Sequence, residues 1–375
     1  MIGIRADANS IIATGHMMRC ITIARALVVQ GESVTFFMAD DESGRLLRSF
    51  AKDEFEGVVL GTDYRNMESE TEALEKELKE REIQILLVDS YSVTKAYFER
   101  LSKMCKVAYL DDLAKEAYPV NIVINYSGYS KNMGYDKLYT GVKGYGDRDS
   151  KLFLGLKYAP LREQFYNNLS GVTQKADMEN DSLSILLATG GSDMCNMITS
   201  VLDKARENGL VSKETKLKSS GIGDYKGVKW HVVVGDFVEK PEEIEQFAGE
   251  YEDIIIHRSV KNMAKLMRSC DLGVLAAGTM LTECAACSLP AIFYQVADNQ
   301  KYNVEYFGGL KGMLFAGEVQ NSESEKNRTV DRIIDGVKRL SCDRGQLKAM
   351  GDSLLEITDG RGAERIARAL MDEIR

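Results

Sequence analysis

The sequence lacks any apolar run long enough to cross a bilayer, and its opening, MIGIRADANS, lacks a basic segment followed by an apolar one. A membrane-spanning helix needs about 20 mostly apolar residues, and a secretory leader carries those two segments in that order. The seven cysteines are an odd number at scattered positions, which indicates free thiols in a reducing compartment rather than a disulfide framework. We therefore expect a cytoplasmic protein without a membrane span.

The sequence also has fewer positively charged than negatively charged residues. The 48 Lys and Arg residues are outnumbered by 57 Asp and Glu residues, so the formal net charge is −9. Such a chain has no overall electrostatic attraction to a phosphate backbone or to an anionic membrane. We do not expect nucleic acid as a partner, and the sequence leaves the oligomeric state open.

Several motifs that define mechanistic classes are missing. The sequence contains neither a G-x-x-x-x-G-K-[ST] P-loop nor a G-x-S-x-G nucleophile elbow, and GIGDYKG lacks the dinucleotide-binding spacing. With only three histidines, a histidine metal cluster would need all of them from distant segments. Cys284 and Cys287 form a C-x-x-C pair, but it falls inside a predicted helix, and two buried thiols are the simpler interpretation. We expect neither a metal nor a cofactor, so the chemistry has to depend on His16 and on carboxylates.

Short β-type apolar runs alternate with amphipathic stretches from the first residue onward. In the first half the runs are residues 2–5, 34–38, 57–60, 83–88, 107–110 and 122–124; in the second half they are residues 185–188, 232–234, 254–256, 272–275 and 291–294. This alternation predicts βαβ units, and so a parallel sheet covered by helices. A chain of 375 residues exceeds what one core usually serves. We therefore predict an α/β protein with two Rossmann-like, doubly wound domains that face a central cleft.

The domain boundaries follow from the polarity of the sequence. We expect an N-terminal domain at residues 1–166, a polar linker at 167–183, a C-terminal domain at 184–345 and a helical tail at 346–375. In the N-terminal domain, residues 16–30 predict a helix with Met17, Ile21, Ala24 and Val28 on its apolar face.

The loop after the first run combines polar residues with the start of that helix. Asp7 follows the run directly, and Gly15 allows the backbone to approach a ligand just before His16. The ordinary pKa of histidine lies near physiological pH, so a histidine at a strand end is a natural candidate for a general base. The alternative is a first-turn histidine that only bonds to local backbone.

A second loop follows the first run of the C-terminal half. Gly190, Gly191 and Ser192 would present backbone N–H groups to a bound anion, although an ordinary turn before a helix has the same composition.

A third loop contains Gly278 and Thr279, which would begin a helix pointing at a phosphate. Glu283 lies one turn further on the same face, where it could accept the two hydroxyl groups of a ribose.

The sequence resembles the UDP-sugar hydrolases of the pseudaminic acid pathway, whose opening reads R-x-D…G-x-G-H-x-x-R. Further matches are V-D-S-Y to the family's I-D-x-Y, L-R-E-Q-F to L-R-x-x-F, G-G-S-D to G-G-[ST]-D and N-M-A-K-L-M to N-[IM]-A-x-L-M. The segments that carry the resemblance are residues 5–7, 15–20, 85–91, 110–112, 161–165, 190–193 and 262–267. Relative to that family, residues near 208–229 and the C-terminal segment are longer.

The segment from Gly278 to Gln300 is also similar to the UDP-N-acetylglucosamine site of the transferase that makes lipid II. Both families share the GT-B fold. The first resemblance implies hydrolysis of UDP-2,4-diacetamido-2,4,6-trideoxy-β-L-altropyranose to the free sugar and UDP, with His16 as base and no metal. The second implies that Asn299 and Gln300 join the UDP contacts.

A physical mechanism accompanies these resemblances. Water would attack the anomeric carbon with inversion while His16 removes its proton, and Asp7 or Asp89 would flank an oxocarbenium-like centre. Tyr91 and Asn125, at further strand ends, are candidates to bind the two acetamido groups.

Three other functions remain open. A related UDP-N-acetylglucosamine 2-epimerase is disfavoured by the scarcity of histidine, and a glycosyltransferase by the lack of an apolar and basic surface patch. A UDP-sugar-binding protein that is not an enzyme would not require His16.

Overall fold

The computed structural model describes residues 1–9, 12, 14–166, 182–211, 227–235 and 237–375. Within them the chain divides into two units, one formed by Met1–Arg162 with Arg361–Arg375 and the other by Glu163–Gly360. The predicted linker lies outside the described residues apart from Ser182 and Leu183, which begin a strand. Most of the longer segment near 208–229 also lies outside them.

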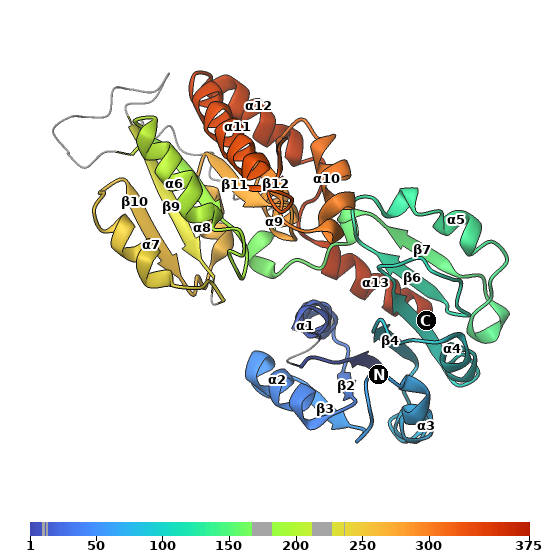
Figure 1. The fold of residues 1–375 in the computed structure, drawn as a ribbon. Helices are drawn as coiled ribbons and strands as arrows, with labels where there is room; N and C mark the ends of the chain where they lie inside the picture. The colour runs from blue at the N-terminus through green and yellow to red at the C-terminus, as the bar shows by residue number, and fades with distance from the viewer. Residues whose placement is uncertain (10–11, 13, 167–181, 212–226, 236) are drawn as a thin grey trace. The chain divides into compact units, whose positions relative to one another are not determined.

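The first unit is built on a parallel sheet of seven strands in the order β3-β2-β1-β4-β5-β6-β7 (Figure 1). The central strands are buried along their whole length, because helices cover both faces. The strands are β1 Ile2–Ala6, β2 Val34–Met38, β3 Glu56–Val59, β4 Ile85–Asp89, β5 Lys106–Leu110, β6 Ile122–Asn125 and β7 Lys151–Leu154.

The helices of this unit form two layers. Helices α1, α2 and α13 contribute to the core on one face of the sheet, and α3, α4 and α5 contribute to the core on the other face. They are α1 Gly15–Val29, α2 Asp41–Ala51, α3 Thr71–Glu80, α4 Lys95–Leu101, α5 Tyr135–Leu138 and α13 Gly362–Ile374.

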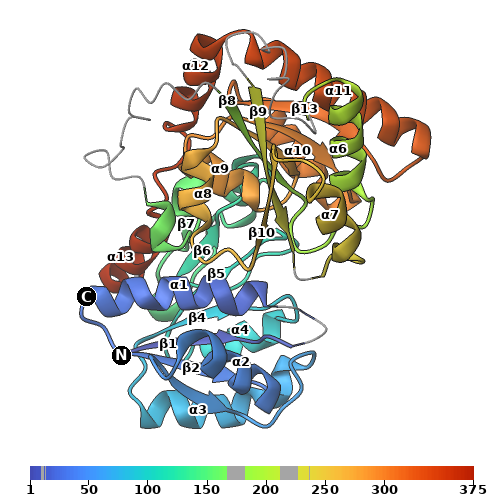
Figure 2. The same ribbon diagram turned by 90° about the vertical axis from the view of Figure 1, so that its left-hand side faces the viewer.

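The second unit has a parallel sheet of six strands in the order β10-β9-β8-β11-β12-β13 (Figure 2). Its strands are β8 Ser182–Ala188, β9 Gly227–Val234, β10 Ile254–Arg258, β11 Leu272–Ala276, β12 Ala291–Gln295 and β13 Met313–Glu318. Its helices are α6 Met197–Glu207, α7 Pro241–Ala248, α8 Met263–Ser269, α9 Met280–Ala286, α10 Lys301–Gly308, α11 Glu323–Ser341 and α12 Arg344–Leu354. The prediction of two Rossmann-like α/β domains is therefore confirmed.

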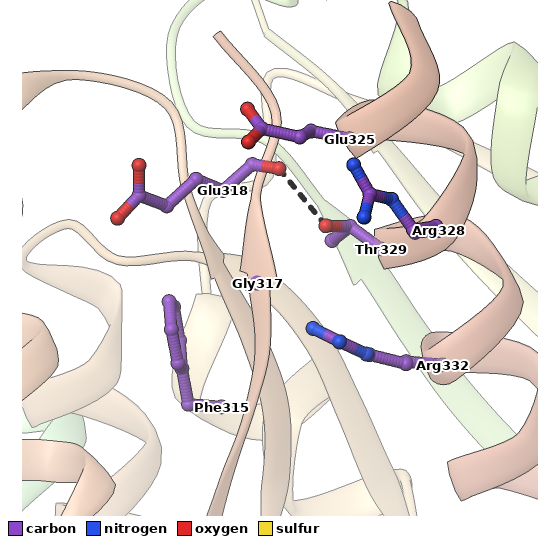
Figure 3. A pocket seen from close by; sticks show the side chains of 7 residues that line it. All are labelled: Phe315, Gly317, Glu318, Glu325, Arg328, Thr329 and Arg332. Carbon is purple, nitrogen blue, oxygen red and sulfur yellow. Dashed lines mark hydrogen bonds between the residues drawn. The ribbon is translucent and has the colours of Figure 1, made fainter. Parts of the chain in front are cut away.

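The edge strand β13 is protected by α11. Arg332 donates from Nη1 to the Ala316 carbonyl at 3.1 Å, and the Thr329 hydroxyl donates to the Glu318 carbonyl at 2.9 Å (Figure 3). Two carbonyls next to this exposed edge are thus already occupied. This arrangement disfavours pairing of β13 with another strand.

The predicted C-terminal tail is divided between the two units. Its proposed start at residue 346 lies inside α12, which belongs to the second unit, whereas α13 belongs to the first. The apolar face of α13 is buried against α1, with Ile366 and Leu370 fully covered. Glu373 of α13 also forms an ion pair with Lys151 of β7 at 2.7 Å.

The packing of α13 corrects the predicted face of α1. Met17, Ile21 and Ala24 are buried as predicted, but Val28 is 49% exposed and Leu27 is buried in its place. Because both the sheet and α13 contact α1, its buried band is wider than one amphipathic stripe.

The cysteines agree with the expectation of free thiols. All seven cysteines are free thiols, and Cys284 and Cys287 are buried in and directly after α9. Among the described residues, none of the helices combines the length and apolar character needed to cross a membrane.

The packing of α13 in the core of the first unit predicts that a truncated apolar side chain in this helix lowers the free energy of unfolding. Leu370→Ala should lower the free energy of unfolding of the first unit by about 2–5 kcal/mol, because it removes buried methyl groups and leaves a cavity. Urea unfolding followed by fluorescence and circular dichroism measures the change. Val29→Ala on α1, whose parent side chain is 87% exposed, is the control and should change stability by less than about 0.5 kcal/mol. Equal effects of the two variants would contradict the assignment of α13 to this core.

Candidate active site

A histidine and a carboxylate meet where the strand order of the first sheet reverses, between β1 and β4. Open α/β sheets bind ligands at the carboxyl ends of strands at such a reversal. His16 lies in the first turn of α1, directly after the loop that follows β1, and Asp89 is the last residue of β4. His16 Nδ1 and Asp89 Oδ1 are 2.5 Å apart. The topology thus brings together two residues that are 73 positions apart in the sequence.

Arg19 holds the same carboxylate from one turn further along α1. Its Nε donates to Asp89 Oδ2 at 2.6 Å and its Nη2 donates to Oδ1 at 2.5 Å, which makes a bidentate pair. Burial by itself raises the pKa of Asp89, but the Arg19 guanidinium and the bond from His16 outweigh it and hold that pKa well below its usual range. Asp89 is therefore ionised at neutral pH although its side chain has no exposed surface.

The remaining bonds of Arg19 extend the network toward β5 and β6. Its Nη1 donates to Asp112 Oδ2 at 2.8 Å and to the Tyr126 hydroxyl oxygen at 2.7 Å. Tyr91 donates to the same Asp112 oxygen at 2.9 Å, and its ring packs edge-on against His16 with the ring centroids 4.7 Å apart. The imidazole is therefore fixed both by its bond to Asp89 and by the ring of Tyr91.

The geometry determines which nitrogen of His16 can act. Two groups face Nδ1, Asp89 Oδ1 at 2.5 Å and Arg19 Nη2 at 3.1 Å. Because Asp89 is ionised, only accepts and is the nearer of the two, we infer that Nδ1 carries the proton and donates it to Oδ1. In the neutral form of the ring the lone pair is then on Nε2. A buried carboxylate that orients a histidine in this way is the arrangement by which many hydrolases obtain a general base.

Gly15 and Tyr91 both lie next to His16, the first along the chain and the second by ring contact. Gly15 is exposed at the start of α1, and no atom lies within 4 Å of the position that a Cβ would take there. The preceding Thr14 makes no side-chain capping bond to the helix. A ligand group could therefore approach the first turn of α1 next to His16.

Asp7 lies in a different cluster, which corrects its predicted role. It is 3% exposed, its Oδ2 accepts from Arg5 Nη1 at 2.6 Å, and its Oδ1 accepts from the Ala39 backbone N–H at 2.7 Å. Arg5 in turn makes a bidentate pair with the buried Glu70, at 2.7 and 2.6 Å. Both oxygens of Asp7 are used within the fold, so we assign Asp7 to the stability of β1 rather than to a substrate.

The side-chain amide of Asn125 is likewise used in hydrogen bonds within the fold, which corrects its predicted role in binding an acetamido group. It is fully buried; its Nδ2 donates to the Tyr135 hydroxyl at 3.0 Å, and its Oδ1 accepts from the Ser127 backbone N–H at 2.9 Å. These bonds fix the turn after β6, and they leave this side chain no place in an acetamido site.

Sequence reasoning did not give roles to Arg19, Asp112 or Tyr126. Arg19 had a signal, because it matches the arginine of the family's G-H-x-x-R pattern and lies three residues after His16. Asp112 lies in the segment 110–112 of the same resemblance, whereas Tyr126 only follows a predicted strand.

The second unit repeats the topology of the first. Its strand order reverses between β8 and β11, and the two predicted glycine loops follow these two strands. Gly190 has a φ of +96°, a conformation that favours glycine, and the Cβ positions of Gly190 and Gly278 face open space. Ser192 is partly exposed next to Gly191. These loops therefore allow a ligand close to their backbone N–H groups.

The other predicted nucleotide contacts lie around the same sheet edge. Thr279 precedes α9 and is exposed, and Glu283 is partly exposed in the first turn of α9. Asn299 is exposed in the 3₁₀ turn Asp298–Gln300, whereas the Gln300 Oε1 already accepts from the Val296 backbone N–H at 2.9 Å.

The two other histidines are remote from His16 in the sequence and face each other on β9 and β10. His231 Nδ1 and His257 Nε2 lie 3.0 Å apart, and burial lowers the pKa of both. Within the described ranges, no group of three or more His, Cys, Asp or Glu side chains is arranged to hold a metal ion.

Comparison with solved structures defines the class of fold. MurG of Acinetobacter baumannii superposes with a TM-score of 0.66 at 12% identity, covering 99% of both chains. The UDP-GlcNAc 2-epimerase of Neisseria meningitidis, solved with UDP-GlcNAc bound, superposes with a TM-score of 0.59 at 11% identity, covering 99% of this chain and 100% of the other. The protein therefore has the two-domain fold of the GT-B glycosyltransferases.

Among proteins compared by sequence, the chain is similar to the spore coat polysaccharide biosynthesis protein SpsG of Bacillus subtilis, at 24% identity over 99% of this chain and 98% of that protein. It is 22% identical to an uncharacterized protein of Methanocaldococcus jannaschii over 78% of this chain, a region that spans 54% of that relative. No family model matches the chain.

The bidentate pair between Arg19 and Asp89 predicts a contribution to the free energy of unfolding that depends on pH. At pH 7, Arg19→Met should cost about 3–5 kcal/mol, because it leaves a buried carboxylate without its cation. A carboxyl group with a depressed folded-state pKa contributes stability above its ordinary pKa, and loses it as the pH falls through the folded-state value. The difference between wild type and variant should therefore shrink below about pH 4.

Urea titrations at pH 7 and pH 3.5 measure this difference. Arg25→Met is the control, because Arg25 pairs with Glu54 at the surface and its removal should cost less than about 1 kcal/mol at either pH. A cost for Arg19→Met that stays constant with pH would contradict the role given to Asp89.

Proposed function

We propose that the protein is a UDP-sugar hydrolase, in which His16 is the general base for the attack of water on the anomeric carbon. The observation that carries the proposal is the His16–Asp89 pair, an imidazole oriented by an ionised, buried carboxylate at the edge of the sheet where the strand order reverses. The name of the SpsG relative and the UDP-GlcNAc bound to the epimerase of the same fold support a nucleotide sugar as substrate.

The reaction would proceed in one displacement. His16 Nε2 takes a proton from water as the water oxygen bonds to the anomeric carbon. The bond from that carbon to the diphosphate oxygen breaks on the opposite face, and UDP leaves with the electron pair. The imidazolium then faces Asp89, whose negative charge stabilises it. The free sugar forms with inverted anomeric configuration.

The second unit would bind UDP. Backbone N–H groups at Gly190, Gly191 and Ser192, and at Gly278 and Thr279, would donate hydrogen bonds to the diphosphate oxygens, and the start of α9 after Thr279 would contribute about 0.3–1 kcal/mol. Because these groups would stabilise the leaving diphosphate, the proposed reaction needs no metal. Glu283 would bind the ribose hydroxyls, and Asn299 and Gln300 would complete the contacts.

For the sugar, we propose a 2,4-diacetamido-2,4,6-trideoxy hexose, the substrate class that the sequence resemblance implies. Tyr91 is the best placed of the predicted sugar contacts, because it is 53% exposed and packs against His16.

Replacement of His16 tests the base directly. His16→Asn should lower kcat by about 10²–10⁴, the usual contribution of a general base, and should leave UDP affinity nearly unchanged. NMR of UDP release and calorimetry of UDP binding measure the two quantities. His257→Asn is the matched control and should retain wild-type rates. A His16→Asn rate within a few-fold of wild type would remove His16 from the mechanism.

Isotope labelling tests the bond that breaks. In ¹⁸O-labelled water and excess EDTA, the label should appear in the sugar and not in UDP, because the proposed attack is at carbon. NMR before mutarotation should detect the inverted anomer first. Label in UDP, a retained anomer or a strict need for Mg²⁺ would each contradict the mechanism.

The same NMR experiment separates the alternative functions. A 2-epimerase would interconvert UDP-sugars without net release of UDP, and a glycosyltransferase would release UDP only after an acceptor is added. A binding protein would retain UDP affinity in calorimetry and show no turnover. The GT-B fold is shared by proteins with these activities, and only the active-site chemistry distinguishes them.

A further inference from the structure

Two tyrosine hydroxyls belong to the cluster around Arg19, and their hydrogen bonds run in opposite directions. Tyr126 accepts from Arg19 Nη1 at 2.7 Å, because a guanidinium group only donates. The Tyr91 hydroxyl lies 2.9 Å from Asp112 Oδ2, an oxygen that also accepts from Arg19 Nη1 at 2.8 Å. The direction of this second bond decides what the Tyr91 hydroxyl offers to a ligand.

The Tyr91 hydroxyl is the donor in its bond with Asp112. Asp112 forms an ion pair with Arg19, and a carboxylate in an ion pair has no proton to give. Burial, together with the charge of Asp112, raises the pKa of Tyr91 above its ordinary value, so the phenol keeps its proton at neutral pH. The proton therefore lies between Tyr91 and Asp112.

This bond leaves the Tyr91 hydroxyl able only to accept. A phenol hydroxyl has a single proton to donate, and its oxygen can still accept a bond when that proton is used. Among the described residues, Asp112 is the hydroxyl's one hydrogen-bond partner, and the Tyr91 side chain is 53% exposed. Tyr91 therefore presents an acceptor, and no donor, to a ligand beside it.

The acceptor lies next to the proposed base. The ring of Tyr91 packs edge-on against His16, with the ring centroids 4.7 Å apart. Tyr91 follows the end of β4 by two residues, and Asp89, the last residue of that strand, holds His16 from the other direction. A ligand atom that bonds to the Tyr91 oxygen is therefore close to the group that would activate water.

Few groups of the proposed substrate fit such an acceptor. A UDP-linked 2,4-diacetamido-2,4,6-trideoxy hexose has three donors on its sugar ring, namely the two amide N–H groups and the 3-hydroxyl. The amide carbonyl oxygens and the ring oxygen only accept. An acceptor that faces another acceptor leaves both without a hydrogen bond, which is unfavourable once water is excluded. The direction of the Tyr91 bond thus restricts how the sugar can be placed.

We propose that Asp112 is a positioning residue that fixes the Tyr91 hydroxyl as an acceptor, and that Tyr91 in this state binds an N–H or O–H donor of the sugar beside His16. The identity of the ligand as a diacetamido sugar rests on the proposed function, whereas the bond between Tyr91 and Asp112 does not. A carbonyl, carboxylate or phosphate group is disfavoured at this position.

NMR of the full chain with tyrosine labelled with ¹³C at Cζ tests the bond without a substrate. Tyr91→Phe assigns the Tyr91 signal. That signal should shift in Asp112→Leu, which removes the acceptor, and should stay near its wild-type position in Asp112→Asn, whose amide oxygen still accepts. Asp149→Leu is the matched control, because Asp149 pairs with Lys143 just before β7, at the opposite edge of the sheet. It should leave the Tyr91 signal unchanged.

Three analogues of the parent UDP-sugar test what the acceptor binds. In two of them an ester oxygen replaces the N–H of one acetamido group, and the third lacks the 3-hydroxyl. For one analogue the wild-type kcat/KM should fall about tenfold or more, mainly through a higher KM, because the Tyr91 oxygen loses its donor. Tyr91→Phe should show the same loss on the parent sugar and no preference between the parent and that analogue. Asp112→Leu should reduce the preference, and Asp112→Asn should retain it.

A purely structural role of Asp112 predicts a different result. Because Arg19 also holds Asp89, a general loosening of the cluster would lower kcat through His16, and it would do so in the Tyr91→Phe background as well. If Asp112 acts through Tyr91, Asp112→Leu raises KM in the wild-type background. It then adds less than about twofold to the effect of Tyr91→Phe.

Three results would overturn the proposal: a Tyr91 signal that Asp112→Leu does not shift, a wild type that treats all three analogues like the parent sugar, or equal effects of Asp112→Leu with and without Tyr91. If Asp112→Leu fails to fold, Asp112→Ala, which lets water replace the carboxylate, is measured in its place with the same expectations. The comparison of wild type with Tyr91→Phe needs neither variant. If the wild type releases no UDP from the parent sugar, the proposed function is rejected, and the Cζ signal still decides the bond.

Discussion

The candidate active site depends on one buried, ionised carboxylate. Asp89 has no exposed surface, so its charge is stable only because Arg19 binds both oxygens and His16 donates to one of them. The same bonds hold His16 in one tautomer, connect α1 to β4, and reach β5 and β6 through Asp112 and Tyr126. A single ion cluster thus joins the fold of the first unit to its proposed chemistry.

The two units use one topology for different purposes. In each sheet the strand order reverses next to the first strand, and the loops that follow the two central strands carry the candidate ligand contacts. In the first unit these positions hold side chains that can move a proton. In the second they hold glycines, whose backbone can approach a diphosphate. This division agrees with the separate roles proposed for His16 and for UDP binding.

Much of this fold could be predicted from the sequence, because buried parallel strands leave continuous apolar runs. Two of the edge strands, β7 and β13, were missed, since both are only partly buried, and Gly317 interrupts the second. The return of α13 to the first unit was also missed, because an amphipathic pattern does not identify its partner. His16 was found at a helix start and Asp89 at a strand end, as separate candidates. Their pairing, and the internal roles of Asp7 and Asn125, depend on contacts that local patterns do not encode.

The state of the His16 ring tests the account most directly. Long-range ¹H–¹⁵N NMR reads the tautomer of each neutral imidazole, and with only three histidines in the chain the spectrum can be assigned with His231→Asn and His257→Asn variants. At a pH where the rings are neutral, the account predicts that His16 carries its proton on Nδ1 and its lone pair on Nε2, and that Asp89→Asn removes this preference. A His16 ring protonated on Nε2 in the wild-type protein would contradict it.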